Sequence, residues 1–433
     1  MTDVIIIGAG AAGLMAAKKL SGAGVSVCVL EARDRVGGRI HTITNNDLAT
    51  PVEGGAEFIH GNLSATLALL KEAGMEKQEL TGETWQVNKG WWNQENDFFE
   101  NAELVIKQLK SLKEDISVAQ FLQQFFSEEK YVNLRKLFTS YVEGYYSGET
   151  ERMSAKAFLR EWMSEDEQQY RPSGGYGKMM HYLEENCKKA GVIIQLSAAV
   201  KEIKWREGYA EVTDDNNHVF IACKVIITVP LGVWTSDDNT KGGIKYNPAL
   251  PSKTEAAKQM GFGAVIKILL QFKDIFWEKE SIKLQTDINL SSVQMVLTDM
   301  PIPTWWTQFP QRTALLTGWL SGPKAEQIKN ETDVNILLKA LDSLSPIFKI
   351  DRNILKDKLK WWKVFNWTKE PFTYGSYSYS TTDTISARKK LMETVENTLF
   401  FAGEALYEGP ETGTVEAALI SGINVSKEIL SSR

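Results

Sequence analysis

The stretch VIIIGAGAAGL, residues 4–14, decides the fold of this 433-residue chain. Its four leading apolar residues predict a short buried strand. Gly8, Gly10 and Gly13 follow at G-x-G-x-x-G spacing, before a run of small residues that favours a helix. The next segment, SGAGVSVCVLEA at residues 21–32, predicts a turn and a second strand. Strand, glycine turn, helix and strand in this order form a βαβ unit, so the sequence predicts an α/β fold that opens with parallel strands.

The glycine turn is also a predicted binding site for a dinucleotide. Gly8 permits the tight turn, Gly10 lets a pyrophosphate approach the backbone, and Gly13 lets helix and strand pack closely. The helix N-terminus offers free N–H groups and a positive dipole end to phosphates. Glu31 ends the second strand, where an acid that binds ribose hydroxyls is expected. A glycine-rich turn without a ligand is the alternative, but the strand, helix and acid in sequence favour a dinucleotide.

The composition limits the remaining classes of function. A hydrophobic fraction of 43% and a charged fraction of 24% are typical of a globular protein with two or three domains. The net charge of −6, with no basic block, argues against a nucleic-acid partner. No window approaches the ~20 apolar residues of a spanning helix, and the residues before the first strand show no signal-peptide pattern, so we expect none.

The cysteines and histidines add two expectations. Cys28, Cys187 and Cys223 lie far apart, as expected for reduced thiols, so we expect a cytoplasmic protein without a membrane segment. The four histidines are scattered and match no metal-ligand spacing, so the sequence predicts no metal site.

The rest of the chain mixes helical and strand patterns. Residues 62–75 and 101–171 predict mainly helix, whereas residues 192–229 predict strands with a hairpin turn at 214–217. Both patterns alternate through residues 262–372. This arrangement predicts α/β topology with a second domain inserted in pieces.

Three further stretches carry a family resemblance. EARDRVGGR, residues 31–39, resembles the second FAD motif of the flavin monoamine oxidase and polyamine oxidase family. LFFAGE at 399–404, followed by TGTVEAALISG at 412–422, resembles the C-terminal motif of that family. VIITVPLGV at 225–233 resembles the strand and turn that return to the adenosine half. The resemblance runs in family order from residue 4 to about residue 430.

The resemblance implies a Rossmann-like FAD-binding domain and an inserted, discontinuous α+β substrate domain of the amine oxidase type. The FAD-binding domain is expected from residues 1–80, 172–255 and 371–433. The substrate-binding domain is expected from residues 81–171 and 256–370.

The resemblance also assigns the residues that bind FAD. Glu404 holds the ribityl and phosphate part, and the helix from about Thr414 to Leu430 points its N-terminus at the N1–C2=O edge of the flavin. Ser376 stands where enzymes with covalent FAD have a cysteine, so non-covalent FAD is expected. The full expected set is Gly8, Gly10, Ala12, Gly13, Glu31, Ala32, Arg33, Gly38, Arg39, Gly55, Ala56, Glu57, Phe58, Val200, Pro230, Trp367, Gly403, Glu404, Thr414 and Val415.

The stretch VIKILLQF, residues 265–272, places a lysine inside an otherwise apolar strand. A buried ammonium loses its hydration and must find a partner or release its proton. In the family that the chain resembles, a strand lysine in this context holds a water against flavin N5, and Lys267 matches it. We therefore expect Lys267 to be buried and catalytic. The alternative is an edge strand with the ammonium in solvent.

The segment WWKVFNWTKEPFTYGSYSYS, residues 361–380, resembles the family segment that places aromatic rings beside the flavin. By this resemblance Tyr377 steers a neutral amine toward the flavin, and Trp367 packs near the ring system. Monoamine oxidases have a second tyrosine at the position of Thr414, where polyamine oxidases tolerate a small residue. We therefore expect half of an aromatic cage, and a substrate face that is more open and more polar.

VEGGAEFIHG, residues 52–61, resembles a polyamine oxidase stretch at the active-site entrance. His60 matches a histidine that, when neutral, accepts a hydrogen bond from an amine or relays a proton; the alternative is a structural histidine that caps a loop. Glu57 stands where the family commonly has an uncharged residue, and it either attracts a distal ammonium or is solvated.

The resemblance implies FAD-dependent oxidation of a polyamine or of a primary or secondary amine. A hydride passes to flavin N5, the imine is hydrolysed to an aldehyde, and O2 is reduced to H2O2. The expected partners are a small-molecule amine and O2, and the expected state is a monomer or homodimer.

Other functions remain open at this point. An L-amino-acid oxidase needs an arginine fork for the substrate carboxylate, for which Arg135, Arg152 and Arg160 are candidates. A desaturase of the same superfamily would usually lack the flavin-facing lysine. A non-catalytic flavoprotein would have no need of Lys267 and Tyr377.

Overall fold

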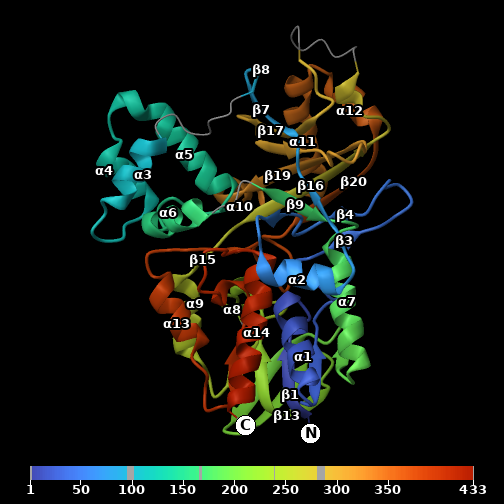
Figure 1. Cartoon of the computed structure of the whole chain (residues 1–433), viewed down its shortest axis with the longest axis vertical. Helices are drawn as coiled ribbons and strands as arrows, with labels where there is room; N and C mark the ends of the chain where they lie inside the picture. The colour runs from blue at the N-terminus through green and yellow to red at the C-terminus, as the bar shows by residue number, and fades with distance from the viewer. Residues whose placement is uncertain (1, 95–101, 165–167, 238, 280–287, 433) are drawn as a thin grey trace.

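The computed structural model describes residues 2–94, 102–164, 168–237, 239–279 and 288–432. The chain folds into two stacked halves with a group of helices at one side, and both termini lie at the far end of the lower half (Figure 1). Each half is built around one large sheet.

The lower sheet confirms the predicted βαβ opening. Strand β1 (Thr2–Ile7) leads through helix α1 (Ala11–Gly22) to β2 (Val27–Leu30), which pairs with β1 in parallel. The sheet runs in the order β10-β2-β1-β13-β12-β11-β14, and β22 pairs with β13. The remaining strands are β10 (Ile193–Gln195), β11 (Val200–Arg206), β12 (Tyr209–Asp214), β13 (Val219–Ile227), β14 (Lys245–Asn247) and β22 (Leu399–Phe401). The turn predicted at residues 214–217 joins β12 to β13.

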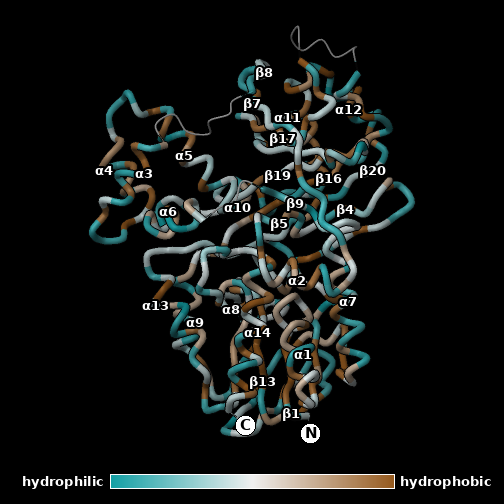
Figure 2. The backbone as a smooth tube through the Cα atoms, viewed as in Figure 1, coloured by the Kyte–Doolittle hydropathy of each residue, from teal (hydrophilic) through white to brown (hydrophobic). Residues whose placement is uncertain are grey.

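Helices cover both faces of this sheet because its central strands β1, β2 and β13 are mostly apolar. Figure 2 shows hydrophobic residues along α1, α14 and β13 in the lower half. Helix α1 packs against α14 (Val415–Ser431) and α7 (Tyr176–Lys189), and α9 (Pro251–Gln259) packs against α13 (Thr384–Met392). The short helix α8 (Leu231–Trp234) follows β13, and α2 (Ser64–Glu72) packs on α14.

The upper half holds a seven-stranded sheet in the order β20-β16-β19-β18-β17-β7-β8. All eight residues of β16 are buried, because β19 and β20 flank it and α10, α11 and α12 lie over the sheet (Figure 1). The strands are β7 (Glu83–Asn88), β8 (Trp91–Asn93), β16 (Val265–Phe272), β17 (Val293–Thr298), β18 (Thr304–Trp306), β19 (Leu315–Ser321) and β20 (Leu359–Asn366). The helices are α10 (Gly322–Ile328), α11 (Asp333–Phe348) and α12 (Arg352–Lys358).

The helical group at the side confirms most of the helix predicted for residues 101–171. It contains α3 (Ala102–Lys110), α4 (Val118–Phe125), α5 (Val132–Gly144) and α6 (Ala155–Ser164). Residues 101 and 165–167 lie outside the described residues, and β9 (Gln169–Pro172) is a strand. The four helices close around the buried rings of Phe121, Phe138 and Phe158.

Small sheets link the two halves at the site. Strand β9 pairs with β5 (Ile59–His60) and β6 (Lys77–Glu79), and β3 (Thr42–Ile43) pairs with β4 (Val52–Glu53). Strand β15 (Gly261–Phe262) pairs with β21 (Ser378–Tyr379). The architecture is the α/β fold that the sequence predicts, while the exact domain limits at residues 80, 171, 255 and 370 stay a prediction.

Candidate active site

One cavity of about 1750 Å³ joins the glycine turn of the lower half to strand β16 of the upper half. Its wall includes Lys267, Tyr377 and His60, and every predicted cofactor residue except Gly13. The structure therefore brings nearly the whole predicted set together around one space. Whether each of these side chains contacts a cofactor stays a prediction.

The glycine turn has the shape that a pyrophosphate requires. Gly8 has a φ of +108°, in the region that favours glycine. A Cβ on Gly13 would lie 2.0 Å from the Gly8 carbonyl oxygen, so only glycine lets α1 pack this close to β1. A Cβ on Gly10 would meet no atom within 4 Å, because Gly10 faces open space at the N-terminus of α1. The turn at Gly8 and the close packing at Gly13 are as predicted, and the approach of a pyrophosphate to Gly10 stays a prediction.

The Glu31 carboxylate is fixed at the end of β2. The Ala9 and Arg33 backbone N–H groups donate hydrogen bonds to its two oxygens, at 2.7 and 2.9 Å. A carboxylate has about four acceptor positions, so two remain for the hydroxyls of a ribose. The side chain is buried and lines the cavity, as a dinucleotide site requires.

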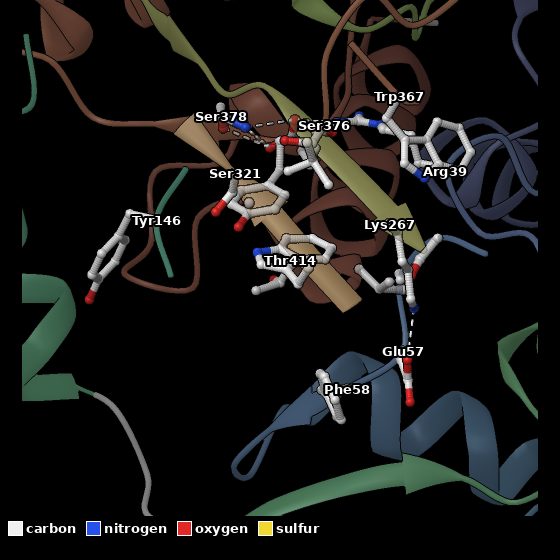
Figure 3. A pocket seen from close by; sticks show the side chains of 18 of the residues that line it. Arg39, Glu57, Phe58, Tyr146, Lys267, Ser321, Trp367, Ser376, Ser378 and Thr414 are labelled. Carbon is white, nitrogen blue, oxygen red and sulfur yellow. Dashed lines mark hydrogen bonds and ion pairs between the residues drawn. The ribbon is translucent and has the colours of Figure 1, made fainter. Parts of the chain in front are cut away.

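A second carboxylate, Glu404, follows β22, which runs parallel to β13, so it stands at the same edge of the lower sheet as Glu31. Arg39 Nη1 donates to Glu404 Oε1 at 2.7 Å and to the Ser376 carbonyl oxygen at 2.6 Å. Ser378 Oγ donates to Glu404 Oε2 at 2.6 Å. These bonds tie the loop after β2 to the loop after β22 and to β21. Figure 3 shows Arg39, Ser376 and Ser378 in the upper part of the view.

Helix α14 points its N-terminus at this part of the cavity. Thr414 is its N-cap, since its Oγ1 accepts a hydrogen bond from the Ala417 N–H at 3.2 Å, and both Thr414 and Val415 line the cavity. The end of a 17-residue helix favours negative charge beside it. The open glycine turn, the two fixed carboxylates and this helix end together fit FAD.

Lys267 is buried, and its partner is an acid. The residue is 1% exposed, and its Nζ lies 2.7 Å from Glu57 Oε2 and donates to the Gly55 carbonyl oxygen at 3.1 Å. Figure 3 shows the two side chains pointing toward each other. The expectation of a buried lysine is confirmed, and the alternative of an exposed edge strand is wrong, because β16 lies between two other strands.

Glu57 differs from both expectations for it. It is 5% exposed and accepts hydrogen bonds from Lys267, from Arg171 Nε at 2.8 Å, from Trp306 Nε1 at 3.1 Å and from Gln308 Nε2 at 3.2 Å. Four donors fill the acceptor positions of one carboxylate, so Glu57 is neither solvated nor available to a distal ammonium. Burial would raise the Glu57 pKa, but the charges of Lys267 and Arg171 outweigh burial and lower it to about 2.

The wall beside Tyr377 contains a second ring that the sequence did not predict, while the expected open and polar substrate face stays a prediction. The Tyr377 ring lies parallel to the Trp319 ring, with an interplanar angle of 15° and 6.5 Å between centroids. Trp319 stands directly opposite Lys267 in the register of β16 and β19 and lines the cavity. Thr414 is small, as expected, but Trp319 supplies a second ring from a different strand.

The pair Trp305 and Trp306 divides between core and cavity. Trp305 is buried in the core of the upper half, whereas Trp306 lines the cavity and packs against Phe58 with 5.4 Å between centroids. Successive side chains of β18 point to opposite faces, so strand alternation is the signal that could have separated them. Arg171 and Trp319 had no comparable signal, because each depends on contacts between distant segments.

His60, Trp367 and Ser376 also lie at the cavity. His60 Nδ1 is 3.4 Å from the Tyr145 hydroxyl, and burial lowers the His60 pKa, so its imidazole is neutral near pH 7. Trp367 Nε1 donates to the Gly54 carbonyl oxygen at 2.8 Å, which fixes the indole beside Gly55. Ser376 Oγ donates to the Gly263 carbonyl oxygen at 2.9 Å.

The three arginines that were candidates for binding a substrate carboxylate lie outside the cavity wall. Arg135 and Arg152 bind backbone carbonyl oxygens, Arg160 lies beside Glu161, and none of the three lines the cavity. Among the described residues, the arginines in the cavity wall are Arg33 and Arg39, both at the cofactor end. No helix in the described segments is long and apolar enough to cross a membrane.

Solved structures share this fold across the whole chain. Putrescine oxidase bound to putrescine superposes with a TM-score of 0.79, at 20% identity and 99% coverage of both chains. Cyclohexylamine oxidase from Brevibacterium oxydans IH-35A gives a TM-score of 0.78 at 18% identity, over 100% of this chain and 99% of that one. At these identities the likeness establishes the fold.

Sequence comparison identifies the family. Polyamine oxidase 2 of Arabidopsis thaliana is 28% identical over 98% of this chain and 87% of its own length. Lysine-specific histone demethylase 2 of Homo sapiens is 27% identical over 99% of this chain, which spans only 53% of that protein. The family model described as "Flavin containing amine oxidoreductase" matches residues 11–430. The chain therefore belongs to the flavin-containing amine oxidoreductases, enzymes that act on CH–NH groups.

Proposed function

We propose that this protein binds FAD without a covalent bond and oxidises an amine, with O2 as the electron acceptor. The observation that carries the proposal is the single cavity that leads from the glycine turn and the N-terminus of α14 to the buried Lys267. FAD, when bound, accepts a hydride from the carbon beside the amine nitrogen and passes two electrons to O2, so amine, O2 and water give aldehyde, ammonia or a smaller amine, and H2O2.

Lys267 is proposed to hold a water at the reacting face. An ammonium group has three N–H donors, and two of them are used by Glu57 and by the Gly55 carbonyl oxygen. The third can bind a water in the cavity that Lys267 lines. Such a water would serve hydrolysis of the imine and reoxidation by O2.

The side chains around Lys267 are proposed to orient a neutral amine. The parallel rings of Tyr377 and Trp319 form one wall. The neutral His60 imidazole can accept a hydrogen bond from the amine without adding a positive charge. Orientation of the reacting carbon is the main contribution that a protein makes when the cofactor carries the chemistry.

The alternatives fit the cavity less well. An L-amino-acid oxidase needs a guanidinium near the substrate, but the described arginines in the wall are both at the cofactor end. A desaturase or a non-catalytic flavoprotein would leave the Lys267–Glu57 pair and the aromatic wall without use. Relatives named polyamine oxidase and putrescine oxidase support an amine as the substrate.

Three cysteines without a disulfide support a reducing compartment such as the cytoplasm.

The test is peroxide formation by the purified yellow protein with panels of monoamines, polyamines and L-amino acids. Amines are expected to give peroxide, and activity confined to amino acids would contradict the proposal. Acid precipitation of the protein should release all flavin into the supernatant, because Ser376 cannot form a thioether. Flavin retained in the pellet would contradict non-covalent binding.

A further inference from the structure

Three buried charged side chains meet at the cavity wall and are here named the charge cluster: Arg171, Glu57 and Lys267. Their exposed fractions are 9%, 5% and 1%. Lys267 Nζ donates to Glu57 Oε2 at 2.7 Å, and Arg171 Nε donates to the other oxygen, Oε1, at 2.8 Å. The three residues come from β9, from the segment between β4 and β5 and from β16, so the cluster forms only in the folded chain.

Neutral donors fix the Glu57 carboxylate as well. Trp306 Nε1 lies 3.1 Å from both carboxylate oxygens, and Gln308 Nε2 donates to Oε1 at 3.2 Å. The centroid of the Trp306 ring is also 5.4 Å from Lys267 Nζ. Both Glu57 and Lys267 line the cavity, and Figure 3 shows their side chains facing each other. The carboxylate therefore holds the lysine ammonium at one place in the wall.

Arg171 lies behind the wall and does not line the cavity. Its Nη1 and Nη2 donate to the carbonyl oxygens of Phe309 and Thr307, at 3.2 and 3.0 Å. The Phe58 ring covers the guanidinium, with 4.9 Å between its centroid and Arg171 Cζ. The guanidinium is therefore fixed inside the protein, and it acts on the cavity through its charge rather than through a contact.

The charges of the cluster do not cancel. Lys267 alone would present one positive charge to the cavity, and pairing with Glu57 would neutralise it. Arg171 compensates the charge of Glu57, so two cations and one anion leave one net positive charge at the wall. Such a charge acts over several ångströms, because the protein interior screens it less than water does.

We propose that Glu57 and Arg171 are positioning residues that set the reduction potential of the flavin through Lys267. Glu57 holds the ammonium in place, and Arg171 offsets the negative charge that Glu57 brings. This inference rests on the proposed binding of FAD beside Lys267. The step concerned is the two-electron reduction of oxidised FAD, in which the amine supplies a hydride and the reduced flavin later returns both electrons to O2. Reduction places negative charge on the flavin, so a positive charge nearby stabilises the reduced form.

The test is the midpoint potential of bound FAD at pH 6, titrated with dithionite against a dye of known potential. Glu57→Gln leaves two cations without an anion, so it should raise the ratio of reduced to oxidised flavin about tenfold, or by about 30 mV for two electrons. Arg171→Gln leaves a neutral pair and should lower that ratio by a similar factor. Shifts in the same direction, or a shift missing in either variant, would overturn the proposal.

A double variant separates the effect of charge from loss of structure. Glu57→Gln combined with Arg171→Gln removes one charge of each sign and leaves Lys267 as the cation of the cluster, so the potential should return close to the parent value. A merely structural role predicts the largest disturbance in the double variant. If Glu57→Gln alone does not fold, the double variant and Arg171→Gln still decide, because a potential that stays lowered in the double variant would overturn the proposal.

Two controls assign the effect to the cluster. Arg352→Gln removes an exposed arginine that pairs with Asp342 outside the cavity wall, and it should leave the potential unchanged. Glu53 is a second buried acid on which the charge of Lys267 acts, and burial raises its pKa to about 7, so it is mainly neutral at pH 6. The series should keep its pattern when repeated with Glu53→Gln. Loss of the pattern there, or an equal shift in Arg352→Gln, would overturn the proposal.

The outcome is independent of amine oxidation, because dithionite takes the place of the amine. A parent protein that binds FAD but oxidises no amine would contradict the proposed function and still give the potentials that decide this inference. A parent protein that binds no FAD would overturn both.

Discussion

The Lys267 ammonium lies 2.7 Å from the Glu57 carboxylate, with both residues almost fully buried. Arg171 Nε binds the same carboxylate from the other side at 2.8 Å. Two cations therefore share one anion in the interior. This ion cluster fixes the position of the lysine ammonium and explains how a charged side chain is tolerated in a strand of aliphatic residues.

Lys267→Met should slow reoxidation of the flavin by O2 far more than it slows reduction by amine. Methionine is an unbranched side chain one atom shorter than lysine, and it removes the donor that is proposed to hold a water. Stopped-flow measurement of the two half-reactions separates these effects. An unchanged oxidative half-reaction would show that Lys267 has no part in the reaction with oxygen.

Glu57→Gln should lower the free energy of unfolding by about 3 kcal/mol, because it leaves Lys267 and Arg171 as buried cations without an anion. Urea unfolding, monitored with FAD content, measures the loss. Glu255→Gln removes the acid of an exposed ion pair with Lys258 and should change stability little. Equal effects of the two substitutions would contradict the assigned importance of the buried cluster.

Glu57→Gln should also change how the free energy of unfolding depends on pH. The pKa of Glu57 falls from 4.5 to about 2 on folding, as Lys267 and Arg171 overcome the opposing effect of burial. Its ionised form therefore contributes stability that is complete above pH 4.5 and is lost as the pH falls toward about 2. Unfolding curves of Glu57→Gln should lack this part of the acid dependence. A parallel pH dependence in the two proteins would contradict the assignment.

Glu53 should have the opposite effect on the pH dependence of the free energy of unfolding. Its side chain is buried, Oε1 accepts from Thr42 and from the Tyr176 N–H, and Oε2 has no hydrogen-bond partner among the described residues. Burial raises its pKa from 4.5 to about 7. Stability from this group is full below pH 4.5 and is lost as the pH rises to about 7. Glu53→Gln should flatten that loss in unfolding experiments, and an unchanged slope would count against it.

Amine oxidation should become faster from neutral to alkaline pH, because the fraction of neutral amine rises as the substrate loses its proton. His60 should not contribute to this profile, since burial lowers its pKa and keeps the imidazole neutral throughout. The measurement is kcat/KM against pH for one monoamine. A flat profile would speak against a neutral amine as the reacting form.

The sequence predicts the parts of the site that depend on local pattern. The strand, glycine turn and helix from Thr2 to Gly22 form through neighbouring residues, and Thr414 caps α14 through its own next turn. The burial of Lys267 follows from the apolar strand around it. Each of these features needs only a few consecutive residues, so spacing and residue type identify them.

The contacts of Lys267 and Tyr377 could not be predicted in the same way. Glu57 lies 210 positions before Lys267, and their contact depends on how the β5 region meets β16. Trp319 reaches Tyr377 only through the register of β19 against β16. Such contacts are set by packing between distant segments. For that reason the sequence did not predict the Trp319 ring beside Tyr377.

Anaerobic reduction of the bound flavin by a monoamine tests the central claim most directly. The purified protein should be yellow, and n-pentylamine or 2-phenylethylamine should bleach its flavin in the absence of O2, with the colour returning when air is admitted. A protein that takes up no FAD on reconstitution, or whose bound flavin stays oxidised with every amine, would contradict the account.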